Sequence, residues 1–171
     1  AYDNTMKVRH VAVETLEDLG MLRGSKYVQS DVYDTYRLAG KFLKSGRRVL
    51  FSGTPCQIAG LYAVVGKNHT GLLTCDLICH GVPSPKVFHM AITAIEERKK
   101  SKVIDLIFRE KSDGWLYPSV RIVFADGTFH NEMATDNHFN LGFQKNIYLR
   151  PACYQCPIKP GGSRADITLG D

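Results

Sequence analysis

The chain has 171 residues, of which 44% are hydrophobic and 23% charged, which is enough for one well-cored domain and tight for two. Lysine and arginine number 22 against 17 for aspartate and glutamate, and this mild basic excess is spread along the chain, which argues against a nucleic-acid-binding surface. No apolar run reaches the roughly 18 residues that cross a bilayer, and no signal-peptide pattern opens the chain, so we expect a cytoplasmic domain without a membrane span.

The first quarter of the chain predicts a lead-in followed by the first long helix. Ser30 or Asp31 is the expected cap of that helix, and Gly46 is its expected stop. Because the chain starts at Ala1 and stops after a strand-like run, we expect a domain excised from a longer protein. The predicted segments are residues 7–13 (extended), 14–22 (short helix), 25–30 (strand) and 31–44 (helix).

A strand, a turn and a helix follow in residues 48–65. Residues 48–51 are typical of a short buried strand, and Ser52 and Gly53 end it. Thr54 is a good helix N-cap, Pro55 fits the first helical position, and Gln57 can reach back to the Thr54 amide. Cys56 therefore lies in the first helical turn. There, unpaired N–H groups and the helix dipole favour a thiolate, which suits metal ligation or redox chemistry.

The same pattern recurs in residues 72–100. A predicted strand ends at Cys79 and His80, and a helix capped by Ser84 follows the turn. Two such repeats imply parallel strands with right-handed crossovers, and ligands gather beyond the carboxyl ends of strands in sheets of this type. We therefore expect Cys56 and Cys79 to share one edge of the sheet. Cys75 lies deeper along its strand and is expected in the core.

The remaining elements complete an α/β fold with a mixed sheet, a parallel βαβ core and a C-terminal antiparallel hairpin. Strands at 103–109, 119–124 and 128–132 flank a turn at Asp126 and Gly127, and Trp115 lies in a loop that we expect to pack on the sheet. A short helix at 136–145 and a last strand at 166–169 follow. We expect a single domain over residues 1–171. Its parts are a lead-in (1–24), the βαβ core (25–100), strands and hairpin (101–135), and a helix with a Cys-rich loop (136–171).

Five cysteines without a secretion signal favour metal or redox chemistry over disulfides. Cys153 and Cys156 form a Cys-x-x-Cys pair among prolines and glycines, so we expect no helix there and no thioredoxin-like site. On spacing alone, zinc and an iron–sulfur cluster are close to even. Cys56 and Cys79 would supply the other two ligands.

Five motifs, in this order, resemble the beta-subunit family of coenzyme F420-reducing hydrogenase and formate dehydrogenase. They are GSKYVQS (24–30), FSGTPCQ (51–57), DLICHGVPSP (76–85), RPACYQCP (150–157) and RADITLGD (164–171). The resemblance covers the chain from about residue 22 onward. It implies an oxidoreductase with a [4Fe–4S] cluster and FAD that passes electrons to coenzyme F420 or another low-potential acceptor. The implied cluster ligands are Cys56, Cys79, Cys153 and Cys156.

If a flavin binds, the residues at the sheet edge are its candidate contacts. The backbone amides of Ser52, Gly53 and the following helix start form a natural anion cradle. Lys26 would add a cation, Ser25, Thr54 and Gln57 polar contacts, and His80 a donor to a flavin carbonyl or a cluster sulfide. The structural alternatives are a solvated Lys26, helix capping by Thr54 and Gln57, and a plain turn histidine.

Two other functional classes stay open. Structural zinc held by the four cysteines would make a non-enzymatic domain that binds a partner protein, and a degenerate family member could serve as an adapter. Implied partners of the redox function are electron-donor or acceptor proteins, namely hydrogenase, dehydrogenase or ferredoxin-like subunits. The sequence has no Walker loop, Gly-x-Gly-x-x-Gly or Ser-His-Asp order, which argues against a nucleotidase, a standard dinucleotide fold and a hydrolase.

Overall fold

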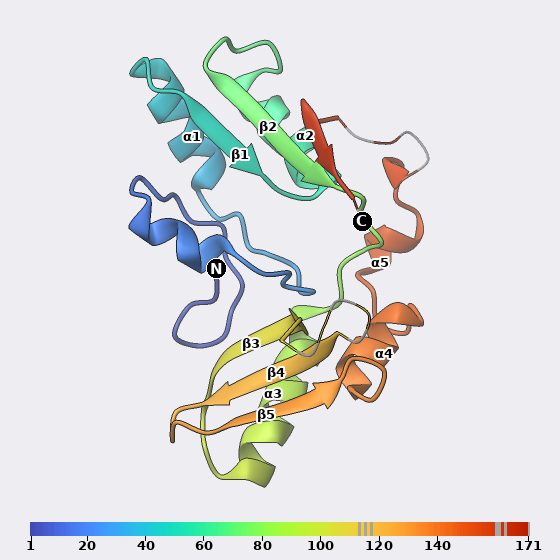
Figure 1. The fold of residues 1–171 in the computed structure, drawn as a ribbon. Coiled ribbons are helices and arrows are strands. Elements are labelled where there is room, and N and C mark those ends of the chain that lie inside the picture. Colours follow the sequence, from blue (N-terminus) through green and yellow to red (C-terminus); the bar gives the residue numbers. More distant parts are fainter. Residues whose placement is uncertain (113, 115, 117, 160–161, 163, 171) are drawn as a thin grey trace. The chain divides into compact units, whose positions relative to one another are not determined.

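A computed structural model describes residues 1–171 except positions 113, 115, 117, 160, 161, 163 and 171. The prediction about Trp115 therefore lies outside the described residues. The chain forms two compact units, and each is built from two separate stretches of sequence (Figure 1). Unit 1 comprises Ala1–Asp31 and Val82–Cys153, and unit 2 comprises Val32–Gly81 and Tyr154–Asp171. None of the helices that the structure describes is long and apolar enough to pass through a bilayer.

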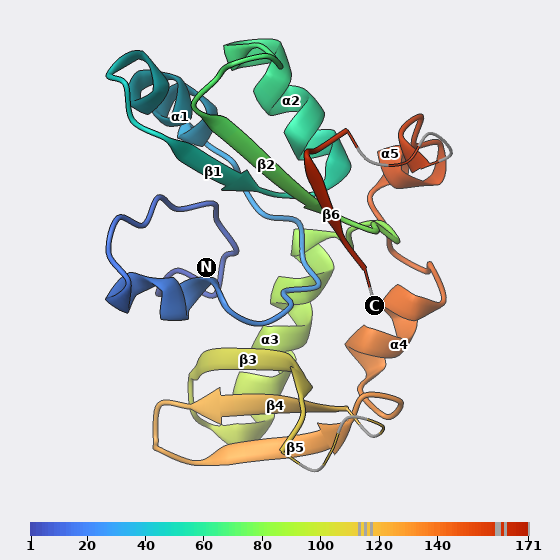
Figure 2. The same cartoon turned by 45° about the horizontal axis from the view of Figure 1, so that its top comes forward.

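Unit 2 contains a parallel three-stranded sheet in the order β1-β2-β6. Its strands are β1 (Val49–Ser52), β2 (Leu72–Leu77) and β6 (Ile167–Leu169). Helices α1 (Thr35–Lys44) and α2 (Pro55–Val65) pack together over one face of this sheet (Figure 2). Between them and the strands lies a small core with Ala39, Phe51, Ile58 and Leu61 fully or nearly fully buried.

The other face of this sheet exposes apolar side chains. Strand alternation brings Leu50 next to Leu73, and Leu77 next to Leu169, and all four are exposed. Cys75 lies on this face and is half-buried, so the expectation that it belongs to the core is wrong. The neighbouring Thr74 and Asp76 take the buried positions instead.

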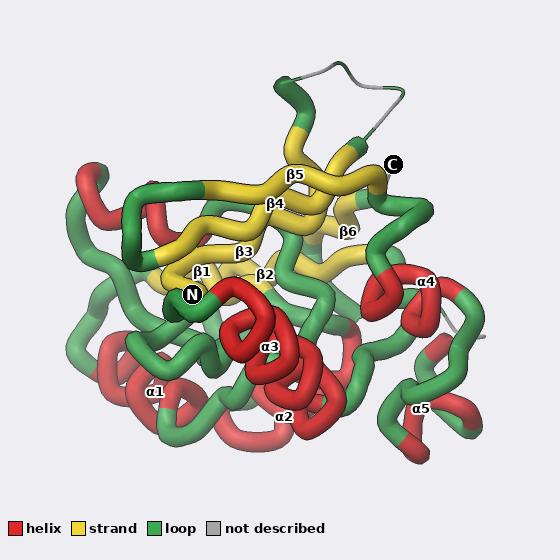
Figure 3. The backbone as a smooth tube through the Cα atoms, turned by 90° about the horizontal axis from the view of Figure 1, so that it is seen from below, coloured by secondary structure: helices red, strands yellow, loops and turns green. Residues whose placement is uncertain are grey.

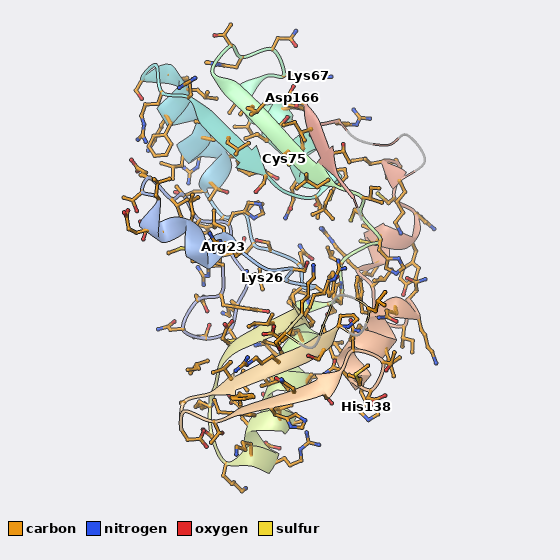
Figure 4. All side chains as sticks on the ribbon, in the orientation of Figure 1. Arg23, Lys26, Lys67, Cys75, His138 and Asp166 are labelled. Atoms are coloured by element: carbon orange, nitrogen blue, oxygen red, sulfur yellow. The ribbon has the colours of Figure 1, made fainter. Side chains whose placement is uncertain are left out.

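Polar side chains attach β6 to β2. Thr74 donates its N–H and its hydroxyl to Asp166 Oδ2 at 2.8 and 2.7 Å, and Thr168 donates its hydroxyl to Asp76 Oδ1 at 2.8 Å. The Thr74 hydrogen bonds, helped by the nearby Lys67 ammonium, lower the pKa of Asp166 (Figure 4). These contacts add to the backbone pairing of a strand that has only three residues.

Unit 1 contains an antiparallel sheet in the order β3-β4-β5, drawn in yellow in Figure 3. Its strands are β3 (Val103–Glu110), β4 (Ser119–Phe124) and β5 (Phe129–Met133). Helix α3 (Pro85–Lys99) contributes Phe88 and Ile92 to a core shared with Phe108 and Val120. Gly127 has φ +82° in the β4–β5 turn, a backbone conformation that favours glycine.

The fold class is confirmed as α/β with a parallel βαβ segment and an antiparallel hairpin, although these lie in two sheets. The predicted starts of α2 and α3 are confirmed, each with proline at its first position. The prediction of one domain over residues 1–171 stays a prediction, since compact units do not by themselves show independent domains.

Three local predictions are wrong in part. Residues 25–30 form no strand, and Asp31 makes only an isolated bridge to Arg9. The first long helix begins at Thr35 after Asp34, so Ser30 does not cap it; the Ser30 hydroxyl instead lies 2.7 Å from His10 Nδ1. The predicted helix at 14–22 is the shorter 3-10 helix η1 (Glu17–Leu22).

Candidate cysteine and cofactor site

Cys56 lies in the first turn of α2, directly after the carboxyl end of β1. Thr54 is the N-cap with an extended backbone, and its N–H donates to Gln57 Oε1 at 2.9 Å, which completes the predicted capping box. The Cys56 side chain is exposed and its thiol is free of any disulfide. Capping residues therefore hold this cysteine at a defined place on the surface of unit 2.

The Cys56 sulfur has a polar neighbour that sequence reasoning treated only as a cap or a flavin contact. Thr54 Oγ1 lies 3.2 Å from Cys56 Sγ, close enough for a hydrogen bond in which either atom donates. A Thr-x-Cys spacing at a predicted N-cap is the signal that could have revealed this contact, because the N-cap side chain faces the first helical turn.

Tyr36 of α1 is a second neighbour that the sequence did not mark as part of the site. Its hydroxyl donates to the Gln57 carbonyl at 2.8 Å. Burial raises the pKa of Tyr36, and the charge of nearby Cys56 raises it further. Gly60 makes this approach possible, because a Cβ at that position would lie 2.9 Å from the Tyr36 hydroxyl.

Cys79 and His80 follow the carboxyl end of β2. Strand β2 runs parallel to β1, and Ser52 at the end of β1 stands opposite Cys75. Cys56 and Cys79 therefore follow the same ends of two neighbouring parallel strands, as predicted. Cys79 is half-buried and His80 is exposed, and both make contacts within the protein.

Cys153 and Cys156 lie on either side of the point where the chain passes from unit 1 to unit 2. Cys153 is the third residue of the one-turn helix α5 (Pro151–Tyr154), and its N–H donates to the Arg150 carbonyl at 2.8 Å. The expectation that no helix forms here is therefore wrong. Cys156 follows the helix in an irregular segment, and both cysteines are half-buried and free.

The donor chemistry fits a soft metal centre, whereas the side-chain positions do not define one. All five cysteines are free thiols, and thiolates are the ligands of iron–sulfur clusters and of structural zinc. Among the residues that the structure describes, no three His, Cys, Asp or Glu side chains gather into a group that could hold a metal ion. The four-cysteine ligand set stays a prediction.

The anion cradle expected after β1 has partners inside the protein. The Gly53 N–H donates to the Cys75 carbonyl at 3.1 Å, and the Thr54 N–H donates to Gln57. A phosphate at these two amides would have to displace internal hydrogen bonds, which costs free energy. Flavin contacts by Ser52, Thr54, Gln57 and His80 stay predictions for their side chains.

Lys26 and Ser25 belong to unit 1, where Lys26 has a structural task. Its ammonium donates to the carbonyls of Arg23 and Gly24 at 2.7 and 3.3 Å and lies 5.6 Å from the centre of the Tyr2 ring (Figure 4). Burial lowers the pKa of Lys26, and the Asp105 carboxylate partly opposes that shift. Ser25 is exposed.

Comparison with known proteins identifies the family. A search of curated proteins finds no match to the chain. The family model for the C terminus of the coenzyme F420 hydrogenase/dehydrogenase beta subunit matches residues 46–171. That range begins just before β1 and includes all five cysteines. The chain therefore belongs to the family of the C-terminal part of coenzyme F420 hydrogenase/dehydrogenase beta subunits.

Proposed function

We propose that this chain is the electron-transfer domain of an oxidoreductase and that Cys56, Cys79, Cys153 and Cys156 hold a [4Fe–4S] cluster. The domain would relay electrons between this cluster, FAD, and coenzyme F420 or another low-potential acceptor. The observation that carries the proposal is the placement of free Cys56 and Cys79 after the same ends of adjacent parallel strands, in a chain of this redox family.

The surroundings of Cys56 suit a negatively charged metal–thiolate centre. The first turn of α2 directs backbone N–H groups outward, and the positive end of the helix dipole lies there. The exposed sulfur is accessible to incoming iron and sulfide. This turn would therefore stabilise the ligating thiolate through the backbone itself.

For the flavin we propose contacts through side chains at the end of β1 and the start of α2. Ser52, Thr54, Gln57 and His80 offer hydroxyl, amide and imidazole groups, whereas the Gly53 and Thr54 amides are already used within unit 2. Ser25 and Lys26 of unit 1 remain further candidates. Bound FAD would convert between hydride and single-electron transfer, and the protein would bind and orient it.

The proposed partners are electron-donor or acceptor subunits, namely a hydrogenase, a dehydrogenase or a ferredoxin-like protein. The family is named for a subunit, which implies assembly with other chains. A net charge of +5 favours encounter with an acidic electron carrier, because opposite net charges raise association rates.

The test is anaerobic reconstitution of the whole chain with iron, sulfide and FAD. Iron, sulfide, zinc and flavin are then measured together with the visible spectrum. We expect about four irons per chain and a flavin spectrum in the wild type. Cys153→Ser should lose the cluster because it removes a ligand, whereas the matched control Cys75→Ser should keep it.

Two results would contradict this proposal in different ways. A colourless protein with tightly bound zinc that Cys153→Ser releases would favour a non-enzymatic, zinc-stabilised domain. A cluster that survives in Cys153→Ser but is lost in Cys75→Ser would show that the ligand assignment is wrong.

A further inference from the structure

We propose that Thr54 is a positioning residue for the ligand Cys56, whose sulfur accepts the Thr54 hydroxyl proton when it binds metal. This hydrogen bond would raise the reduction potential of the cluster. The inference rests on the proposed function, because it concerns a metal-bound Cys56.

The Thr54 hydroxyl has one proton and two acceptors within reach. Its oxygen lies 3.1 Å from Gln57 Oε1 and 3.2 Å from Cys56 Sγ. Gln57 Oε1 also accepts the Thr54 N–H at 2.9 Å. Gln57 Oε1 therefore keeps a donor even when the hydroxyl turns to the sulfur.

The direction of the Thr54–Cys56 hydrogen bond depends on whether the sulfur carries a proton. A free thiol can donate to Thr54 Oγ1 while the hydroxyl donates to Gln57. A metal-bound cysteine sulfur has lost its proton and can only accept. The Thr54 hydroxyl must then be the donor, and rotation of that hydroxyl alone makes the change.

The hydroxyl is held in place before metal binds. Thr54 has an extended backbone at the N-cap, and Pro55 fixes the φ angle of the next residue. Gln57 is itself restrained, because its carbonyl accepts a hydrogen bond from Tyr36 at 2.8 Å. Little conformational entropy is therefore lost when Thr54 donates to the sulfur.

A hydrogen bond to a ligand sulfur changes the redox equilibrium of the cluster. Reduction adds negative charge to the cluster and its thiolates, so a donor at the sulfur stabilises the reduced form more than the oxidised form. Removing the donor should therefore make the reduction potential more negative.

The test measures the midpoint potential of the reconstituted whole chain by electron paramagnetic resonance during an anaerobic redox titration. Thr54→Val removes the hydroxyl at nearly constant shape, and Thr54→Gly removes it with little loss of capping. We expect both to reduce the equilibrium constant for cluster reduction about tenfold, which is about 59 mV for a one-electron couple. Thr54→Ser keeps the hydroxyl and should keep the wild-type potential.

A cap variant elsewhere controls for loss of helix stability. Asn137 caps α4 (His138–Gln144) by accepting the Asn140 N–H at 2.8 Å, and its neighbours in the sequence are Asp136 and His138 rather than a cysteine. Asn137→Ala should therefore leave the potential unchanged.

The outcomes separate this inference from the proposed function. A cluster that forms in Thr54→Val and Thr54→Gly with the wild-type potential would overturn the role of Thr54 and leave the proposed function standing. An equal shift in Asn137→Ala would also overturn it, because the cause would then be a loosened fold. A wild-type chain that takes up no cluster would overturn the proposed function, and the role of Thr54 with it. If Thr54→Val does not fold, Thr54→Gly decides.

Discussion

Asp166 shows how one carboxylate at the edge of a sheet can stabilise a short strand. It lies next to β6 and accepts the N–H and hydroxyl protons of Thr74, which is fully buried. These hydrogen bonds stabilise the ionised carboxylate and lower its pKa. The pairing of β6 with β2 therefore depends on the charge state of a side chain that water can reach.

The stability that Asp166 contributes should disappear in acid. The pKa of Asp166 is lower in the folded than in the unfolded chain, so between the two values the unfolded chain binds more protons. The contribution is present above the ordinary aspartate pKa of about 4 and is lost as the pH falls through the lowered value. Against Asp166→Asn, urea unfolding should show a wild-type advantage of at most about 1 kcal/mol at neutral pH, because solvent screens an exposed charge.

High salt separates the two causes of the Asp166 shift. Salt screens the attraction of Lys67 much more than the short hydrogen bonds from Thr74. We expect most of the pH-dependent difference to persist in high salt. A wild-type advantage that stays constant from neutral to acidic pH would contradict the assignment.

At the scale of elements, a glycine sets the distance between α1 and α2. A Cβ on Gly60 would lie 2.9 Å from the Tyr36 hydroxyl and 3.1 Å from its ring. Tyr36 has little room to move, because its ring packs 5.7 Å from the Phe51 ring and its hydroxyl bonds to Gln57. This contact also holds the segment that carries Cys56.

Gly60→Ala should destabilise the protein although alanine is the better helix former. Helix propensity alone would add about 1 kcal/mol of stability, whereas overpacking costs about 1–3 kcal/mol. We expect a net loss of about 1 kcal/mol in the free energy of unfolding, measured with urea, and a smaller loss in a Tyr36→Phe background.

Gly20→Ala is the matched control for this prediction. Gly20 is also helical, in η1, and none of the described residues places an atom within 4 Å of the point where its Cβ would stand. Its effect should stay within about 0.5 kcal/mol. Equal losses at both glycines would show that the Tyr36 contact does not cause the effect.

At the scale of the whole molecule, each unit closes around its own core with chain segments that are distant in sequence. Thr74 and Asp166 of unit 2 are separated by 92 residues, and Tyr2 of unit 1 donates to the Leu106 carbonyl across 104 residues. Loop-closure entropy opposes such contacts, so buried apolar area must supply the compensating free energy. In unit 1 that area centres on Phe88 and Phe108.

Phe108→Ala should cost about 3–5 kcal/mol of unfolding free energy, because it leaves a cavity among aromatic rings. Phe108 is 1% exposed, and its ring centre lies 5.3 Å from that of Tyr27 and 6.3 Å from that of Phe88. Urea unfolding and amide hydrogen exchange should show the loss, with lower protection in β3, β4 and α3.

Phe129→Ala on the same sheet provides the comparison. Phe129 is 56% exposed, and its ring centre lies 4.0 Å from the Arg121 guanidinium. We expect a cost of about 1 kcal/mol or less. Similar costs for both phenylalanines would contradict the placement of Phe108 at the centre of the core.

The sequence by itself determined the features that depend on neighbouring residues. Thr54 with Pro55, and Ser84 with Pro85, predicted the starts of α2 and α3, because capping needs only side chains within one turn. The strand–turn–helix order placed Cys56 and Cys79 after adjacent strand ends. Motif order also identified the family that the match over residues 46–171 shows.

Only the tertiary structure decided which groups these residues meet. The division of the strands into two sheets, the half-buried position of Cys75 and the partners of Lys26 and the Gly53 amide all depend on contacts with other segments. Local periodicity cannot supply them, because a strand's outward face and a polar group's partner are set by register and packing between distant parts of the chain. Residues 25–30 illustrate this: their β-rich composition had no neighbouring strand to pair with, and no strand formed.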